Sequence, residues 1–315
     1  MRTITADQID RILTYPALVD ALREAFKADI AAPIRHHHTV KQPGADATLL
    51  LMPAWTTGAQ GGEQFLGTKI VTVFPDNGKL SKPAVLGSYI LMSGATGEPL
   101  AVMDGTTLTR WRTACASALA ASYLAREDAT HLAMIGAGAL APYLVRAHAS
   151  VRPIKRVTLW NRTRGHAVQA AFGLAVGGLE VEVSDDLEAA VRDADIVSCA
   201  TLSSTPLVCG KWLKKGAHVD LVGGFTPKMR EADDDAVKKA RVYVDTRAGA
   251  TKEAGDIVQP LKSGVLKKES ILGDLFELTR GKAKGRTGNM QVTLFKSVGT
   301  AIEDLAAAML VWRGL

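Results

Sequence analysis

One stretch of this 315-residue chain decides its fold: His131-Leu-Ala-Met-Ile-Gly136-Ala-Gly138-Ala-Leu-Ala141-Pro-Tyr-Leu. An apolar strand leads into the spacing G-x-G-x-x-A, and a helical pattern follows. Gly136 permits a tight turn, Gly138 lets the backbone approach a pyrophosphate, and Ala141 allows the helix to pack closely on the strand. The backbone N–H groups at the start of that helix then face the phosphates. The stretch therefore predicts a dinucleotide-binding loop.

The residues that follow this loop predict a parallel sheet. From residue 131 to about residue 246, apolar strands alternate with helical stretches, which is the βαβ pattern of a doubly wound Rossmann sheet in an α/β protein. The predicted strands are 131–135, 156–159, 196–199, 218–222 and 242–244. Ligands bind at the carboxyl ends of such strands, so we expect the cofactor there. The predicted cofactor-binding residues at these ends are Gly136, Ala137, Gly138, Ala139, Leu140, Asn161, Arg162, Thr163, Cys199, Ala200 and Thr201.

The end of the second predicted strand indicates which cofactor binds. An NAD site usually has an acidic residue there, which bonds the ribose 2′-hydroxyl. Here the strand ends in Asn161-Arg162-Thr163-Arg164, without an acid. A guanidinium of Arg162 or Arg164 can pair with a 2′-phosphate, which an acid would repel. The sequence favours NADPH, with NADH as the alternative; an ordinary basic turn is the other interpretation of these arginines.

The flanks of the Rossmann segment predict a second domain. Residues 7–29 have helical spacing interrupted by Pro16, and short β-type runs follow at 48–52, 65–74, 85–92 and 100–103. An alanine-rich helix from Thr113 then crosses into the Rossmann segment. We expect one amphipathic helix over 293–313 to return to the first, β-rich domain.

Composition excludes several classes of protein. A chain that is 47% hydrophobic and 22% charged has ample material for two cores. The net charge of +6 is scattered with few aromatic residues nearby, which argues against nucleic-acid binding but suits attraction of an anion. The N-terminus lacks the apolar core of a signal peptide, and no apolar run is long enough to span a bilayer. We therefore expect a soluble cytoplasmic protein without membrane partners.

The histidine run and the cysteines carry no clear chemistry. His36-His37-His38 on a strand would alternate between faces, so packing is favoured over metal binding. Cys115, Cys199 and Cys209 form no disulfide framework and have no metal-ligand spacing. Cys199 has apolar flanks, which favour packing over a nucleophilic role. We predict no metal site.

Four blocks in order along nearly the whole chain resemble the ornithine cyclodeaminase/mu-crystallin family. They are Leu66-Gly-Thr-Lys69, Met103-Asp-Gly-Thr-Thr-Leu-Thr-Arg-Trp-Arg112-Thr113-Ala-Cys-Ala-Ser-Ala, the Gly136 loop, and Thr293-Leu-Phe-Lys-Ser-Val-Gly-Thr-Ala-Ile-Glu-Asp-Leu-Ala-Ala-Ala. The resemblance implies a substrate and dimerisation domain of residues 1–115 and 296–315, with a Rossmann NADP domain of residues 116–295 inserted. It also implies homodimers and chemistry on α-amino or α-imino acids.

The resemblance also implies roles for individual residues. Lys69 and Arg112 match the positions that hold a substrate carboxylate, and Arg35 looks like the third. A guanidinium fork fits a carboxylate, and a lysine adds a transferable proton, which agrees with catalytic roles for Lys69 and Arg112. Further cofactor contacts are expected from Thr113, Gly223, Lys296 and Ser297.

One departure from the family pattern narrows the expected reaction. Cyclodeaminases carry an aspartate directly after a pair of glycines; here Phe225 follows Gly223-Gly224. A phenyl ring cannot bind an ammonium, so Phe225 is expected to be an apolar wall for a cyclic substrate. The sequence looks most like the ketimine reductases, which reduce Δ1-pyrroline-2-carboxylate or Δ1-piperideine-2-carboxylate to proline or pipecolate. Ornithine cyclodeamination, amino-acid dehydrogenation and a non-enzymatic crystallin-like binding role are the alternatives.

Overall fold

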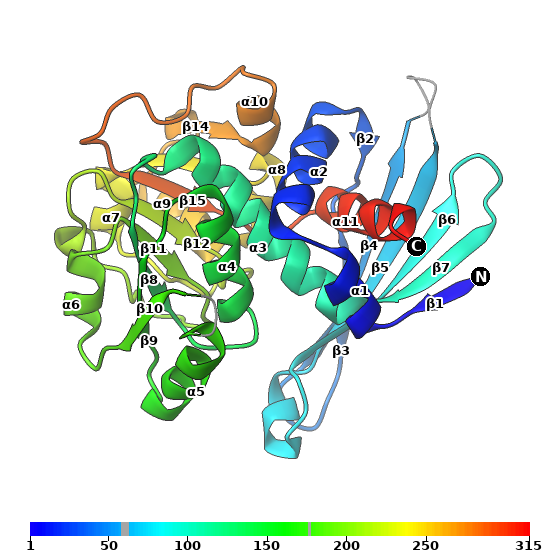
Figure 1. The fold of residues 1–315 in the computed structure, drawn as a ribbon, viewed down its shortest axis with the longest axis horizontal. Helices are drawn as coiled ribbons and strands as arrows, with labels where there is room; N and C mark the ends of the chain where they lie inside the picture. Colours follow the sequence, from blue (N-terminus) through cyan, green and yellow to red (C-terminus); the bar gives the residue numbers. More distant parts are fainter. Residues whose placement is uncertain (58–62, 176–177) are drawn as a thin grey trace. The chain divides into compact units, whose positions relative to one another are not determined.

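The computed structural model describes residues 1–57, 63–175 and 178–315, which form two compact units. Unit 1 comprises Met1–Arg112 and Thr300–Leu315, and unit 2 comprises Thr113–Gly299. The helix α3 (Gly105–Leu124) carries the chain from one unit to the other (Figure 1). The predicted boundaries, residues 115 and 296, lie three and four residues from these limits.

Unit 1 is built on a mixed sheet with the order β1-β7-β6-β5-β4-β2, in which β3 also pairs with β4. All of its strand pairs are antiparallel except β1 with β7. Its strands are β1 (Arg2–Ile4), β2 (Ile30–Ala31), β3 (His36–Val40), β4 (Ala47–Thr56), β5 (Phe65–Val73), β6 (Val85–Ser93) and β7 (Pro99–Asp104). The β-type runs expected from the sequence are therefore confirmed, and the histidine run forms β3.

The helices of unit 1 cover one face of this sheet. They are α1 (Ala6–Ile12), α2 (Tyr15–Lys27) and the last helix, α11 (Ala301–Arg313), whereas the short 3-10 helix η1 (Pro75–Leu80) lies in the connection between β5 and β6. The helical pattern is interrupted before Pro16 as expected, since α1 ends at Ile12 and α2 begins at Tyr15. Pro16 lies in the first turn of α2, where a backbone N–H has no partner within the helix, so the missing N–H costs no hydrogen bond. α11 packs against α2, β4, β5 and β6, so the C-terminal segment returns to unit 1 (Figure 1).

Unit 2 contains one eight-stranded sheet in which every neighbouring pair is parallel, in the order β10-β9-β8-β11-β12-β15-β13-β14. Its strands are β8 (His131–Ile135), β9 (Arg156–Trp160), β10 (Glu180–Val183), β11 (Ile196–Cys199), β12 (His218–Leu221), β13 (Arg241–Val244), β14 (Ile271–Asp274) and β15 (Thr293–Lys296). The helices are α4 (Ala141–Val151), α5 (Arg164–Ala175), α6 (Leu187–Arg192), α7 (Asp234–Lys239), α8 (Arg247–Glu253), α9 (Gly255–Ser263) and α10 (Leu275–Thr279), with 3-10 turns η2 (Gly210–Trp212) and η3 (Lys268–Ser270). The predicted α/β fold is confirmed.

The single amphipathic helix expected over 293–313 is wrong in its first part. Thr293–Lys296 is a fully buried strand, β15, hydrogen-bonded between β12 and β13. Gly299 then adopts φ +82°, a left-handed conformation that glycine tolerates, and the helix starts only at Ala301. The sequence pattern did not indicate this four-residue strand, because the strands it pairs with are distant in sequence. Strands β10 and β14 were also not expected.

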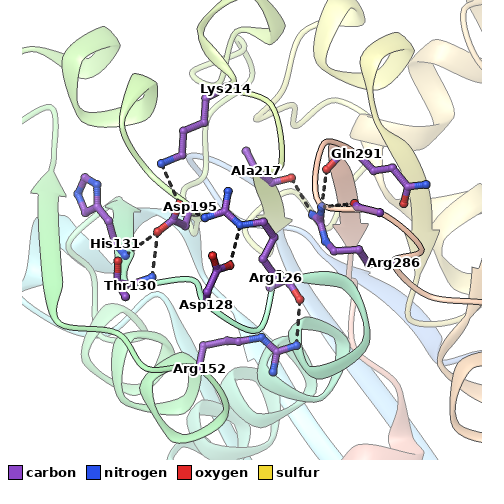
Figure 2. A network of polar contacts seen from close by, with 12 residues as sticks. Arg126, Asp128, Thr130, His131, Arg152, Asp195, Lys214, Ala217, Arg286 and Gln291 are labelled. Atoms are coloured by element: carbon purple, nitrogen blue, oxygen red, sulfur yellow. Dashed lines mark hydrogen bonds and ion pairs between the residues drawn. The ribbon is translucent and has the colours of Figure 1, made fainter.

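Asp195 is the centre of a polar network at the amino ends of strands β8 and β11 (Figure 2). One carboxylate oxygen of Asp195 accepts from Arg126, at 3.0 Å, and is 2.8 Å from the ammonium of Lys214. The other accepts from the backbone N–H groups of Thr130 and His131, at 2.9 and 3.0 Å. Burial alone would raise the pKa of Asp195, but these donors outweigh burial and hold the pKa at about 2.

Replacement of this carboxylate tests its contribution to stability. Asp195→Asn should lower the free energy of unfolding at neutral pH by roughly 1–3 kcal/mol, because charged and backbone donors lose their anion. The folded-state pKa lies below the unfolded value of about 3.9, so the stabilisation is present above that pH and disappears as the pH falls towards 2. Urea unfolding at several pH values measures both effects. Asp128→Asn, at an exposed partner of Arg126, is the control. A difference that does not shrink on acidification would contradict this assignment.

Candidate functional site

Unit 1 contains a buried cluster of charges on the helix-covered face of its sheet. Lys69 on β5 is 1% exposed, and its Nζ lies 2.7 Å from Oδ1 of Asp304 on α11 and 3.3 Å from the hydroxyl of Thr109. The same Oδ1 lies 3.0 Å from Nε of Arg112 at the unit 1 end of α3. Glu303 completes the cluster, because its Oε2 accepts from Arg112 at 2.7 Å. Asp304 and Glu303 are both completely buried.

Strand register explains why Lys69 points into this cluster. Side chains alternate along β5, so Lys69 shares the buried face with Gly67 and Val71, while Ile70 is exposed. Tyr89 on β6 is directly opposite Lys69 and is also fully buried. A Cβ at Gly67 would come within 1.9 Å of the Tyr89 hydroxyl, so only glycine leaves room for this ring. The packing gives a physical reason for the Leu66-Gly-Thr-Lys69 motif.

The environment of Lys69 makes its ammonium a stronger acid than that of an ordinary lysine. Burial lowers the pKa of Lys69, the positive charge of Arg112 lowers it further, and Asp304 partly offsets both, so the pKa is about 8. Arg35 also lowers this pKa by its charge. A group with this pKa is protonated at neutral pH and can still release its proton, which suits a general acid.

All three predicted substrate-binding cations therefore belong to unit 1. Lys69 and Arg112 are joined through Asp304, and Arg35, half-buried between β2 and β3, acts on Lys69 through its charge. Neither Asp304 nor Glu303 was singled out from the sequence. A signal was present, because two adjacent acids in an otherwise apolar, alanine-rich helix need buried partners if that helix is covered.

The glycine loop in unit 2 has the shape that a dinucleotide requires. Gly136 adopts φ +99°, and a Cβ there would lie 2.6 Å from the carbonyl oxygen of Ala200. A Cβ at Gly138 would meet nothing within 4 Å, so that side of the loop is open to a ligand. The N–H of Ala137 donates to the side-chain oxygen of Asn161 at 3.1 Å, which ties the loop to the end of β9. Residues from β8, β9 and β11 thus meet here as predicted, and this loop fits a dinucleotide phosphate.

The two arginines after β9 differ in their surroundings. Arg164 is the first residue of α5, and its guanidinium bonds the carboxylate of Asp185. Arg162 is exposed, as is Thr163. Arg162 is therefore the better placed of the two to meet an anionic group beside Asn161, whose side chain also donates to the carbonyl of Thr163 at 2.9 Å.

A buried carboxylate that the sequence did not reveal holds the strand-end loops together. Oε1 of Glu231 accepts from the backbone N–H of Thr201 at 2.7 Å, and Oε2 accepts from the N–H of Gly223 at 2.8 Å. Asp256 accepts from the N–H of Glu231 at 2.7 Å. Nζ of Lys296 lies 3.4 Å from Asp256 and 3.8 Å from Glu231, and Lys296 is fully buried. Lys296, predicted as a cofactor contact, thus joins this acidic pair at the end of β15.

The remaining predicted residues have distinct positions. Thr113 follows Arg112 in α3, and Ala139 and Leu140 lead into α4. Ser297 is buried, and its N–H donates to the carbonyl of Leu221. Cys199 is buried, and burial raises the pKa of its thiol well above the usual value, which opposes a nucleophilic role. Phe225 is half-buried after Gly224.

Two further features bear on the class of site. Within residues 1–57, 63–175 and 178–315, no group of three or more His, Cys, Asp or Glu side chains could hold a metal ion. Across the same described ranges, every helix is too short or too polar to cross a membrane.

In comparisons with known proteins, nearly the whole chain matches one protein family. Residues 3–314 match the sequence profile of the ornithine cyclodeaminase/mu-crystallin family. The Δ1-pyrroline-2-carboxylate reductase of Colwellia psychrerythraea is 37% identical over 98% of this chain and 97% of its own length. The structure of the Thermococcus litoralis Δ1-pyrroline-2-carboxylate reductase in complex with NADH and L-proline matches with a TM-score of 0.94, at 32% identity, over 100% of this chain and 97% of the other. An archaeal alanine dehydrogenase dimer with bound NAD matches with a TM-score of 0.91, at 29% identity, over 100% and 95%.

Proposed function

This chain belongs to the ornithine cyclodeaminase/mu-crystallin family, and we propose that it uses NADPH to reduce a cyclic ketimine, Δ1-pyrroline-2-carboxylate or Δ1-piperideine-2-carboxylate, to L-proline or L-pipecolate. At a coarser level it is a ketimine reductase-like, NAD(P)-dependent oxidoreductase, as its full-length relatives are reductases and dehydrogenases of this kind. The choice of a cyclic ketimine rests on chemistry within unit 1 and on Phe225.

The observation that carries the proposal is the buried contact of Lys69 and Arg112 with one carboxylate. Lys69 and Arg112 contact two acids, Asp304 and Glu303, and the charge of Arg35 also acts on Lys69. A substrate carboxylate is attracted to these cations, and the attraction is strong because the site is poorly hydrated. The guanidinium groups of Arg112 and Arg35 orient this carboxylate, and Lys69 contributes to holding it.

The proposed reaction needs one hydride and one proton. A bound reduced nicotinamide supplies the hydride, which adds to C2 of the imine. The C=N bond becomes a single bond, and the ring nitrogen gains the proton that Lys69 releases. An ammonium with a pKa of about 8 is largely protonated near neutral pH and is therefore ready to give this proton.

Phe225 supports a cyclic substrate over ornithine. Its half-buried ring follows Gly224, in the position where an aspartate would engage a second amine in a cyclodeaminase. An aromatic ring favours contact with a saturated or imine ring and offers no partner to an ammonium. Ornithine cyclodeamination and amino-acid dehydrogenation are the competing reactions on this scaffold, and a non-enzymatic binding protein is the competing role.

The proposal predicts the substrates that will be turned over. The purified protein should oxidise NADPH in the presence of either imine and release neither proline nor ammonia from ornithine with NADP⁺. Arg112→Ala should lower kcat/KM by about thirtyfold or more, because truncating one partner of a buried charge pair costs roughly 2–5 kcal/mol. Arg192→Ala, in an exposed pair on α6, is the matched control. Absence of imine reduction, or proline formation from ornithine, would refute the proposal.

NADPH is proposed over NADH because β9 is followed by Asn161-Arg162-Thr163-Arg164 and not by an acidic residue. Arg162 is exposed next to Asn161, whose side chain already bonds the glycine loop. Placing Asp at position 161 and removing the Arg162 guanidinium should reverse the local charge. The double change Asn161→Asp with Arg162→Ala should lower the ratio of kcat/KM for NADPH over NADH by at least about tenfold, equivalent to about 1.4 kcal/mol. Arg164→Ala alone should change this ratio less, since Arg164 bonds Asp185. An unchanged ratio in the double variant would remove Arg162 from the cofactor site.

We propose that this chain forms a homodimer through the face of the unit 1 sheet that lies opposite Lys69. Leu51 and Ile70 are cross-strand neighbours on the face opposite Lys69, and Trp55 and Leu86 have the same alternation. Trp55, Ile70 and Leu86 are 37%, 36% and 42% exposed, an unusual amount of apolar side chain for one sheet face. The related archaeal alanine dehydrogenase is a dimer, so a second copy of this chain is the proposed cover.

Mass measurement tests the dimer. Light scattering after size exclusion should give twice the chain mass of 33.4 kDa. Ile70→Asp should give monomer, because a buried unpaired carboxylate opposes association. Phe172→Asp changes a side chain that is 76% exposed on α5 and should leave the mass unchanged. A monomeric wild-type protein would exclude this assembly.

A further inference from the structure

A single carboxylate oxygen lies at the centre of the charged cluster in unit 1. Oδ1 of Asp304 is 2.7 Å from Nζ of Lys69 and 3.0 Å from Nε of Arg112. The other oxygen, Oδ2, has no hydrogen-bond partner among the described residues. Asp304 is 0% exposed, so water does not compete for either contact. One atom therefore sets the separation between an ammonium and a guanidinium that reach the site from different elements.

We infer that Asp304 is the positioning residue of this site, which holds Lys69 in its protonated form and fixes it relative to Arg112. The inference rests on the proposed function, in which Lys69 supplies the proton and Arg112 orients the substrate carboxylate. Asp304 acts through these two side chains. Its fixed negative charge favours the ammonium form of Lys69, and its shared oxygen limits the movement of both cations.

Glu303, the acid next to Asp304 in the sequence, contacts Arg112 through a different atom. Glu303 precedes Asp304 in α11 and bonds NH1 of Arg112 at 2.7 Å. Among the charges that act most strongly on Lys69 are Arg112, Asp304 and Arg35. Adjacent residues in a helix project in different directions, so the two acids meet different atoms of Arg112. Glu303 therefore offers a matched comparison, an acid of equal charge whose carboxylate bonds Arg112.

The remaining groups around Lys69 do not replace Asp304. Tyr89, across the sheet, stays neutral because burial and the charge of Asp304 raise its pKa well above the usual value. Thr109 offers a hydroxyl at 3.3 Å, which cannot counter a positive charge. The titratable and charged groups that face Lys69 are Arg35 before β3, Tyr89 on β6, Arg112 on α3, and Glu303 and Asp304 on α11. Asp304 is the member of this set that both carries negative charge and bonds the ammonium.

The expected consequence is a change in the pH at which the enzyme loses activity. In the wild-type protein, kcat/KM for imine reduction should fall as the pH rises through about 8, where Lys69 loses its proton. Removal of the Asp304 charge lowers the pKa of Lys69 further, so the alkaline limb should move to lower pH by roughly one unit or more in Asp304→Asn. Glu303→Gln should lower kcat/KM through Arg112 and leave the position of that limb close to wild type.

The experiment compares pH profiles of kcat/KM for wild type, Asp304→Asn, Asp304→Glu and Glu303→Gln, each checked for an unchanged unfolding temperature. Asp304→Glu keeps the charge but moves the oxygen by one methylene, so it should restore the alkaline limb while kcat stays at least about tenfold low. If Asp304→Asn does not fold, Asp304→Glu decides alone. Wild-type activity in Asp304→Glu, or superimposed limbs for Asp304→Asn and wild type, would overturn the inference.

A second readout separates this inference from the proposed reaction. The pKa of Lys69 can be followed by NMR of ¹³C-labelled lysine, with the resonance identified by its loss in Lys69→Arg. Asp304→Asn should lower this pKa whether or not any imine is reduced. Absence of imine reduction by the wild-type protein would refute the proposed function, whereas an unshifted Lys69 titration would refute the role of Asp304.

Discussion

The Lys69–Asp304–Arg112 contact is the interaction on which the proposed chemistry of this chain depends. Two cations and a carboxylate meet within 3.0 Å in a region almost closed to water. Removing these charges from water costs several kcal/mol per ion, which is repaid only when geometry and hydrogen bonding are good. A purely structural role would be served as well by apolar side chains. The retained charges, and a lysine whose pKa is about 8, therefore point to binding and proton transfer.

The fold provides this contact by bringing together distant parts of the chain. Lys69 comes from a strand near the middle of the unit 1 sheet, and Asp304 comes from the last helix, 235 residues later. The helix can pack on that face because the segment 300–315 belongs to unit 1, although the chain between has formed unit 2. In unit 2, Glu231 performs a comparable task at the ends of β11 and β12, where one carboxylate joins two loops. In each unit a buried acid thus bonds groups from separate segments of the chain.

Sequence patterns predicted the parts of this arrangement that depend on neighbouring residues. The Gly136 loop, the strands β8 and β11, and the motif around Lys69 have local spacing that reflects local geometry. The partners Asp304, Glu303 and Glu231 could not be predicted in this way, because their positions depend on packing between segments far apart in the chain. Strand β15 was missed for the same reason, since its four residues become a strand only between β12 and β13. An acid on a helix is usually solvated, and the apolar neighbours of Glu303 and Asp304 do not show which cations these acids contact.

Substitution of Lys69 by methionine tests the central claim most directly, because methionine keeps the length and packing of the side chain and removes its proton. The measurement is kcat/KM for NADPH-dependent reduction of Δ1-pyrroline-2-carboxylate, beside the affinity for L-proline. Loss of general acid catalysis should lower kcat/KM by about 10²–10⁴-fold, with the protein still folded. A variant that reduces the imine at a rate near that of the wild-type protein would contradict the account.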